Sequence, residues 1–173
     1  GVDYPKIWHE KCRMCTDERA LLYYLTQLTT VLESRKKQFA ESGCPNLDAY
    51  NQITGENMPR LIFACDEVAE LLDKTGADSE RKKLIAQVEN KLATIARQGR
   101  AFGVHLILAT QRPDANIISG QIKNNMDLRI CGRADNVLSQ IILDSTNAAD
   151  QIPKDAQGRF ITGDGTVFQG YLF

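Results

Sequence analysis

Two short, mostly apolar runs, at residues 61–65 and 104–110, dominate the hydrophobic pattern of the chain. Runs of this length without regular alternation are typical of strands buried on both faces, as in a parallel sheet. Between them, apolar residues recur at helical spacing from about Ser79 to Phe102, and Gly103 is suited to end that helix. A strand, a helix and a strand in this order predict a βαβ unit with two parallel strands.

The same pattern predicts further elements on either side of this unit. A long helix is expected to begin after an N-cap at Thr16 and to end at Gly43 and Pro45, with one buried face formed by Leu21, Leu25, Leu28 and Leu32. The basic run 35–37 near its end is interpreted as a solvated turn, with a phosphate or DNA contact as the alternative. The remaining expected elements are a loop at 44–58, a short helix from Val68, a loop and short helix at 114–126, a third strand at 128–132, a helix at 136–143, a loop at 147–158 and a β-hairpin at 159–172.

Polar residues follow each of the two predicted parallel strands. Asp66 and Glu67 come directly after the first, and Thr110 and Gln111 end the second. In open α/β sheets ligands bind beyond the carboxyl ends of the strands, so these four residues should emerge at one edge. Two adjacent acids in such a place are costly unless they hold a cation or move a proton. The pair matches a Walker B strand, with one acid for Mg²⁺ and one to activate water, and the alternative is an acidic loop.

Composition and charge narrow the class of protein. The 173 residues are 43% hydrophobic and 25% charged, which suits one globular domain with a sizeable core. The net charge is -1, so any DNA contact would need a local patch or a ring of subunits. No apolar run approaches the roughly 20 residues of a membrane span, and no signal peptide is visible.

The five cysteines do not form a recognisable framework. Their odd number argues against structural disulfides. His9, Cys12 and Cys15 could begin a zinc site, with Cys44 as a distant fourth ligand. Structural zinc sites usually show two close ligand pairs, and this sequence has one, so the spacing disfavours zinc.

Four stretches of the sequence together resemble the ATPase core of the FtsK/SpoIIIE family of DNA translocases. They are LIFACDEVAELL (61–72), ARQGRAFGVHLILATQRPD (96–114), ISGQIKNNMDLRI (118–130) and SQIILD (139–144). The ATQRP run after the second strand is the most specific of them, and weaker similarity covers nearly the whole chain. The resemblance implies an α/β fold: a partial RecA-like P-loop NTPase core, with a mostly parallel sheet flanked by helices and a C-terminal β-hairpin. It also implies that residues 1–173 are a single domain, the C-terminal portion of a motor domain.

The resemblance assigns roles to residues at the predicted site. Asp66 is similar to the Walker B acid that coordinates Mg²⁺, and Glu67 to the base that polarises the attacking water. Gln111 corresponds to the polar sensor of the γ-phosphate, and Thr110 lies beside it. Candidates for a basic residue acting across a subunit boundary are Lys123, Arg133 and, with weaker support, Arg97, Arg100 and Arg112. The family's arginine in the helix before the second strand has no counterpart, because Ala86 lies near that position and Arg81, Lys82 and Lys83 lie earlier.

The family resemblance further implies the activity and partners of the longer protein. It predicts an ATP-driven translocase of double-stranded DNA, in chromosome partitioning or conjugative transfer, that uses ATP and Mg²⁺ and works as a hexameric ring of identical subunits. It implies a cytoplasmic motor domain whose full-length parent is anchored in the bacterial cell membrane. Two alternatives stay open: a type VII secretion-like ATPase that moves proteins, and a non-catalytic assembly module. Residues that could meet DNA phosphates are Asn116, Lys123, Asn124 and Asn125.

One motif of the family is absent from the sequence. The chain contains no G-x-x-x-x-G-K-[ST], the loop that cradles nucleotide phosphates. We expect that loop to lie before Gly1. The 173-residue chain alone should then bind ATP very weakly and hydrolyse none, and no stable small-molecule ligand is expected for it. We also expect an uncovered apolar sheet edge and helix face, which would favour self-association.

Overall fold

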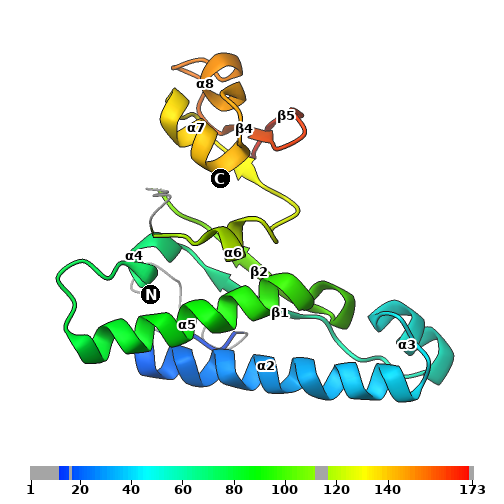
Figure 1. Ribbon diagram of the computed structural model, residues 1–173. Helices are drawn as coiled ribbons and strands as arrows, with labels where there is room; N and C mark the ends of the chain where they lie inside the picture. The colour runs from blue at the N-terminus through cyan, green and yellow to red at the C-terminus, as the bar shows by residue number, and fades with distance from the viewer. Residues whose placement is uncertain (1–11, 16, 112–116, 172–173) are drawn as a thin grey trace. The chain divides into compact units, whose positions relative to one another are not determined.

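The structure is a computed structural model that describes residues 12–15, 17–111 and 117–171 (Figure 1). The chain divides into two compact units, Gly1–Ala109 and Thr110–Phe173. Parallel strands with helices occupy the first, and an antiparallel hairpin lies near the C-terminal end of the second, so the α/β class is confirmed. The expectation of a single domain stays a prediction.

The first unit contains the predicted βαβ unit. Its elements in chain order are α2 (Glu18–Glu41), α3 (Leu47–Thr54), β1 (Leu61–Cys65), α4 (Val68–Leu72), α5 (Ser79–Gln98), the 3₁₀ turn η1 (Arg100–Phe102) and β2 (Val104–Leu108). β1 and β2 are parallel, in a register that pairs Leu61 with Val104 and Cys65 with Leu108. Gly103 ends the turn before β2 in the left-handed conformation, with φ 68°. A Cβ there would lie 2.3 Å from the Leu47 side chain, so only glycine fits without a shift.

Packing of α2 along α5 forms the main core of this unit (Figure 1). The predicted buried face of α2 is confirmed at Leu21, Leu25 and Leu32, whereas Leu28 is half-buried. Each fully buried leucine contributes about 1.5–3 kcal/mol relative to an exposed one. The N-cap is Asp17, whose carboxylate accepts hydrogen bonds from the backbone N–H groups of residues 19 and 20; the expected cap, Thr16, lies outside the described residues.

One face of the parallel pair is open, which corrects the expectation that its strands are buried on both faces. Burial alternates along β1: Leu61, Phe63 and Cys65 are half-buried, whereas Ile62 is 63% exposed. On β2, Ile107 is 56% exposed. The described helices of this unit cover one face only, so an apolar sequence that suits two covered faces leaves one of them in water.

Replacing both Ile62 and Ile107 by threonine is expected to weaken self-association of the chain by tenfold or more. Each isoleucine buried in an oligomer would contribute roughly 1.5–3 kcal/mol, and threonine retains the β-branched shape that strands favour. Light scattering over a concentration series measures the effect. Ile53→Thr is the control, because Ile53 is 67% exposed on α3 instead of on the sheet. Equal association of the double variant and the parent chain would contradict the prediction.

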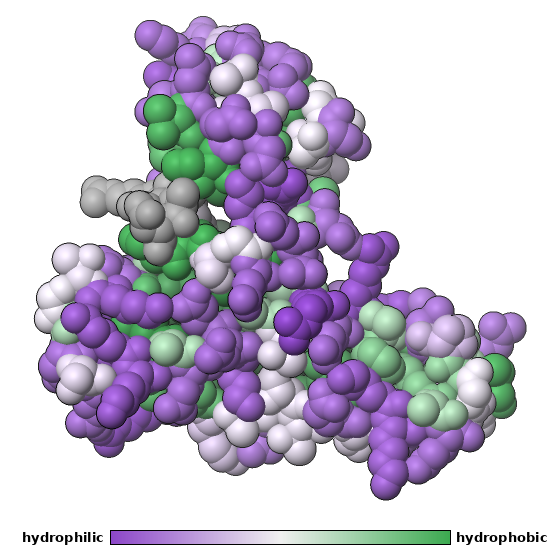
Figure 2. Space-filling view, in the orientation of Figure 1, coloured by the Kyte–Doolittle hydropathy of each residue, from purple (hydrophilic) through white to green (hydrophobic). Residues whose placement is uncertain are grey.

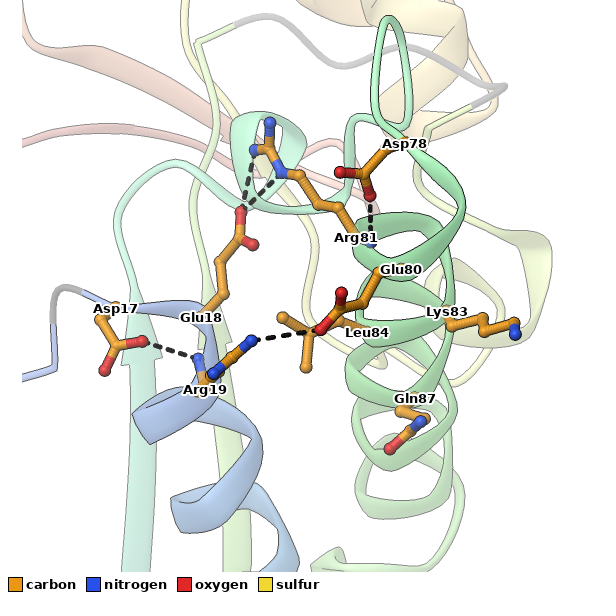
Figure 3. A pocket seen from close by; sticks show the side chains of 9 residues that line it. All are labelled: Asp17, Glu18, Arg19, Asp78, Glu80, Arg81, Lys83, Leu84 and Gln87. Carbon is orange, nitrogen blue, oxygen red and sulfur yellow. Dashed lines mark hydrogen bonds and ion pairs between the residues drawn. The ribbon is translucent and has the colours of Figure 1, made fainter.

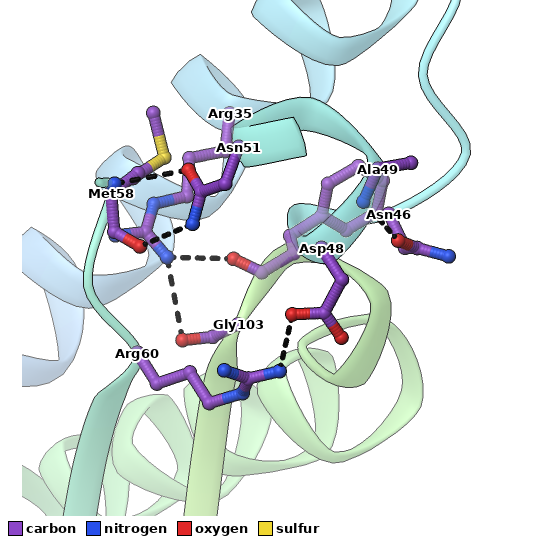
Figure 4. Close-up of polar contacts among 9 residues, drawn as sticks. Arg35, Asn46, Asp48, Ala49, Asn51, Met58, Arg60 and Gly103 are labelled. Atoms are coloured by element: carbon purple, nitrogen blue, oxygen red, sulfur yellow. Dashed lines mark hydrogen bonds and ion pairs between the residues drawn. The ribbon is translucent and has the colours of Figure 1, made fainter. Parts of the chain in front are cut away.

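The segment predicted as a loop at 44–58 contains a helix, α3. Asn46 caps its start by accepting a hydrogen bond from the backbone N–H of Ala49, and Gly55 ends it in the left-handed conformation. Asn51 then exchanges two 3.0 Å hydrogen bonds with the backbone of Met58, which fixes the return toward β1 (Figure 4). The turn-forming residues that suggested a loop are therefore the caps of a short helix.

Arg35 is a buried structural residue, so the interpretation of 35–37 as a solvated turn is wrong for it. Its side chain is directed from α2 to the starts of both strands (Figure 4). One guanidinium nitrogen donates to the carbonyl oxygens of Phe102 at 2.7 Å and Gly103 at 3.3 Å, and the other to that of Pro59 at 2.7 Å. The residue is 5% exposed, and burial lowers the pKa of its guanidinium. Arg35 thus joins three segments that are distant in the sequence.

The second unit is built around a three-stranded antiparallel sheet. Its elements are α6 (Gly120–Lys123), β3 (Ile130–Cys131), α7 (Asn136–Leu143), α8 (Asn147–Gln151), β4 (Arg159–Thr162) and β5 (Val167–Gln169). The hairpin of β4 and β5 confirms the prediction, and the third strand is only two residues long and pairs with β4. The loop expected at 147–158 begins with α8. Figure 2 shows apolar residues gathered over α7, where Val137 is 66% exposed.

The core of the second unit is small. It consists of Cys131, Leu143, Ala148, Ile152 and Ile161. The buried hydroxyl of Ser139 joins α7 to α8: it donates to the carbonyl oxygen of Ser145 at 2.7 Å and accepts from the N–H of Ala148 at 3.0 Å. In neither unit is a described helix both long and apolar enough to cross a membrane.

Candidate functional site

The acidic pair lies at the carboxyl end of β1, as the sequence predicts. Ala109 follows β2 and makes two backbone hydrogen bonds with the first strand's end: its N–H donates to Cys65 at 2.8 Å, and its carbonyl accepts from Val68 at 2.9 Å. Asp66 and Glu67 are the two residues between those hydrogen-bonded positions. They are therefore held beside the end of the neighbouring parallel strand, where α/β proteins bind ligands.

The start of α4 fixes the backbone around this pair. Glu67 is the N-cap residue of α4, with φ -142° and ψ 76°, and its side chain makes no capping hydrogen bond. Val68, Ala69 and Leu72 of this short helix are buried, so the helix is anchored in the core. Asp66 is exposed and Glu67 is half-buried. A carboxylate in water next to a more enclosed one suits a metal ligand beside a base.

The donor set fits magnesium better than a transition metal. Carboxylate oxygens are hard ligands, and Mg²⁺ is usually held by one or two of them together with phosphates and water. Among the residues that the structure describes, no group of three or more His, Cys, Asp or Glu could hold a metal by itself. Asp66 could therefore hold Mg²⁺ only together with ligands such as nucleotide phosphates.

Thr110 and Gln111 follow Ala109 directly and begin the second unit. Thr110 is half-buried and Gln111 is exposed. Arg112 and Asn116 lie outside the described residues. The predicted sensor, Gln111, is thus two residues after Ala109, whose backbone brackets the acidic pair, and its role stays a prediction.

The predicted trans-acting bases have local partners within the second unit. Lys123, the last residue of α6, donates from Nζ to Asp144 at 2.6 Å. Arg133 donates to the carbonyl oxygen of Lys154 at 2.5 Å. The sequence reasoning missed Asp144, although it ends the SQIILD stretch that carries the resemblance, because its partner lies 21 residues away.

The bases of the first unit lie on or just after α5. Arg97 and Arg100 are exposed near its C-terminal end, and Ala86 is half-buried. Arg81 donates from Nε to Glu18 at 3.0 Å. Arg81 therefore joins α5 to α2, which favours a structural role for it.

A surface pocket of about 750 Å³ lies between the N-terminal ends of α2 and α5 (Figure 3). Its charged side chains face one another: Arg19 lies 3.2 Å from Glu80, and an Arg81 nitrogen lies 2.8 Å from Glu18. The first pair is largely exposed and the second is partly exposed, and such pairs contribute at most about 1 kcal/mol. The four acids and three bases that line it leave little net charge, so we assign no ligand to this pocket.

The structure disfavours zinc on the four soft ligands. Cys15 precedes α2, and Cys44 follows it, buried beside Phe39. A helix of 24 residues spans roughly 36 Å, which separates the two sulfurs far beyond the reach of one metal ion. Cys12 is exposed, and His9 lies outside the described residues. Cys44 is therefore a core residue.

Comparison with known proteins identifies the family. The family model described as FtsK/SpoIIIE matches residues 2–115. The DNA translocase SftA of Bacillus subtilis is 35% identical over 157 residues, which cover 87% of this chain and 16% of SftA. The DNA translocase FtsK of Campylobacter jejuni is 31% identical over 150 residues, or 84% of this chain and 15% of FtsK. The chain thus spans less than a fifth of these relatives.

Solved structures agree with these relatives. The pCW3 conjugation coupling protein TcpA, solved as a monomer with ATPγS, is 40% identical, with a TM-score of 0.83 over 89% of this chain and 44% of that one. ATPases 2 and 3 of EccC from Thermomonospora curvata are 22% identical with a TM-score of 0.65, which shows a shared fold alone. The RecA-like fold class is therefore confirmed. By its match over residues 2–115 and its identity with these translocases, the chain belongs to the FtsK/SpoIIIE family.

Proposed function

We propose that this chain is part of an ATP-driven translocase of double-stranded DNA, to which it contributes the Walker B pair and the sensor residues. The observation that carries the proposal is the placement of Asp66 and Glu67 between two backbone hydrogen bonds to the neighbouring parallel strand. DNA as the substrate is supported by the relatives named DNA translocase and by the conjugation coupling protein TcpA.

Different residues of the chain would have different roles in phosphoryl transfer. Bound Mg²⁺ would neutralise charge on the phosphates, and Asp66 would hold it. Glu67 would accept a hydrogen bond from the attacking water and orient it toward the γ-phosphorus. Thr110 and Gln111 would donate hydrogen bonds to the γ-phosphate, and Lys123 or Arg133 would add positive charge from a neighbouring copy. A ring of identical copies, hexameric by family resemblance, completes each site in this proposal.

ATP hydrolysis stimulated by double-stranded DNA tests the proposal. We expect the full gene product to hydrolyse ATP about tenfold faster, or more, when double-stranded DNA is present. The 173-residue chain alone should show no turnover, because its sequence has no phosphate-cradling loop. A full-length product that responds to a protein substrate and ignores DNA would overturn the choice of substrate. Turnover by the 173-residue chain that Glu67→Gln abolishes would overturn the need for a P-loop.

A further inference from the structure

Asp144 has an unusual backbone conformation at the end of α7. Its φ is 57°, and it is the one non-glycine residue with positive φ among the described parts of the chain. The left-handed conformation costs a residue with a Cβ about 1–2 kcal/mol; glycine is the usual choice, and asparagine and aspartate adopt it occasionally, with side chains that hydrogen-bond locally. An aspartate at such a position suggests that the interactions of its side chain offset the backbone cost.

The carboxylate of Asp144 holds two cations at once. Oδ1 accepts from Lys123 Nζ and Oδ2 accepts from an Arg129 nitrogen, each at 2.6 Å. The same Arg129 nitrogen also donates to the carbonyl oxygen of Ile142 at 3.1 Å, so Arg129 is anchored independently. Hydrogen bonds from Lys123 and Arg129 lower the pKa of the Asp144 carboxyl. The ionised cluster therefore carries a net charge of about +1 near neutral pH, which favours an anion.

Contacts other than those of this carboxylate support the turn between α7 and α8. The buried Ser139 hydroxyl already holds the turn between α7 and α8 through Ser145 and Ala148. The Asp144 side chain is 54% exposed, and those of Lys123 and Arg129 are 27% and 28% exposed. Ion pairs that water still reaches contribute only about 0–1 kcal/mol to stability. Stabilisation of the fold is thus a weak explanation for an aspartate in a strained position.

We propose that Asp144 is a positioning residue that holds the Lys123 ammonium ready for a phosphate group. This inference rests on the proposed function, in which Lys123 supplies positive charge. A free lysine side chain loses up to about 2 kcal/mol of rotamer entropy when a ligand fixes it, and an ion pair formed beforehand reduces that loss. Asp144 engages one of the three ammonium protons, and two remain for phosphate oxygens. The phosphate can belong to a nucleotide bound by a neighbouring copy or to the DNA backbone.

Asp144→Asn isolates the charge of the carboxylate. Asparagine has the same shape and accepts the left-handed conformation, but it holds cations far less strongly. In the full gene product we expect it to lower kcat for ATP hydrolysis about tenfold at unchanged KM if the phosphate is that of a nucleotide, or to weaken DNA binding about tenfold if it is that of DNA. Asp144→Asn combined with Lys123→Ala should be no worse than Lys123→Ala alone. Asp164→Asn is the control, because Asp164 accepts hydrogen bonds only from Thr162 and Thr166 among the described contacts.

The outcomes separate this inference from the proposed function. If Lys123→Ala impairs activity or DNA binding and Asp144→Asn impairs neither, the positioning role is overturned and the proposed function stands. If Lys123→Ala has no effect, the proposed role of Lys123 fails and the inference with it. Additive effects of the two substitutions would overturn the inference too. So would a melting temperature of Asp144→Asn low enough that unfolding at the assay temperature accounts for the loss of kcat. Carbon NMR of the 173-residue chain checks the contact itself, because Lys123→Ala must raise the pKa of the Asp144 carboxyl.

Discussion

Replacing Glu67 by glutamine is expected to lower kcat for DNA-stimulated ATP hydrolysis by about 100-fold or more in the full gene product. Removal of a general base typically costs 10²–10⁴-fold. Glutamine retains the size of the side chain and can still touch a water molecule, but it cannot accept the proton that the water loses. ATP binding should persist, because Glu67 is not the residue assigned to the metal. Steady-state kinetics and nucleotide-binding titrations together measure the two effects.

Glu70→Gln is the matched control for this prediction. Glu70 lies on α4, three residues after the N-cap Glu67, and is exposed. The same charge is removed a few ångströms away, so a general electrostatic effect would lower both activities alike. Loss of activity in both variants, or in neither, would contradict the assignment of Glu67 as the base. Asp66→Asn should differ from Glu67→Gln by raising the Mg²⁺ concentration that activity requires.

The βαβ unit and its acidic end could be predicted from the sequence because they depend on local patterns. An apolar run of strand length, a helix long enough for a crossover and a second run admit few arrangements. The parallel register then places Ala109 beside Cys65, so the position of Asp66 follows from the order of the strands.

The open sheet face could not be predicted in the same way. Ile62 and Ile107 lie in apolar runs that are typical of strands buried on both faces. An apolar run does not show whether a second layer of helices covers the other face of the sheet. The helix α3 was missed for a different reason. Asn46 and Gly55 are equally good turn formers and helix caps, and only the buried Leu47 and Tyr50 distinguish the two uses.

The contacts of the candidate site could not be predicted from the sequence either. The order of the motifs identifies Lys123 as a candidate. Its partner, Asp144, becomes known only from the structure, in which the ends of α6 and α7 are in contact. The left-handed conformation of Asp144 also cannot be predicted from the sequence, since aspartate is common in ordinary turns. Contacts between side chains distant in the sequence are what the structure adds to motif reading.

Replacing Arg35 by methionine is expected to lower the free energy of unfolding of the 173-residue chain by about 3 kcal/mol or more. Methionine can fill much of the volume of the aliphatic stem, but it leaves the carbonyl oxygens of Pro59 and Phe102 without their donor. The carbonyl oxygen of Gly103 keeps the backbone N–H of Leu61 at 2.8 Å. Each buried acceptor without a partner costs roughly 1–3 kcal/mol. The starts of β1 and β2 should loosen together, because the same side chain holds both. Urea denaturation followed by far-ultraviolet circular dichroism measures the loss.

Two further variants make this prediction specific to the guanidinium. Lys37→Met removes a positive charge from the same turn of α2 at an exposed position, so it should change the stability by no more than about 0.5 kcal/mol. Arg35→Lys retains the charge but presents a single ammonium, which cannot serve carbonyls on two separate strands as a planar guanidinium does. We expect it to lose most of the stability that Arg35→Met loses. Full stability of Arg35→Lys would show that charge alone suffices, and full stability of Arg35→Met would show that the carbonyls of Pro59 and Phe102 find other donors.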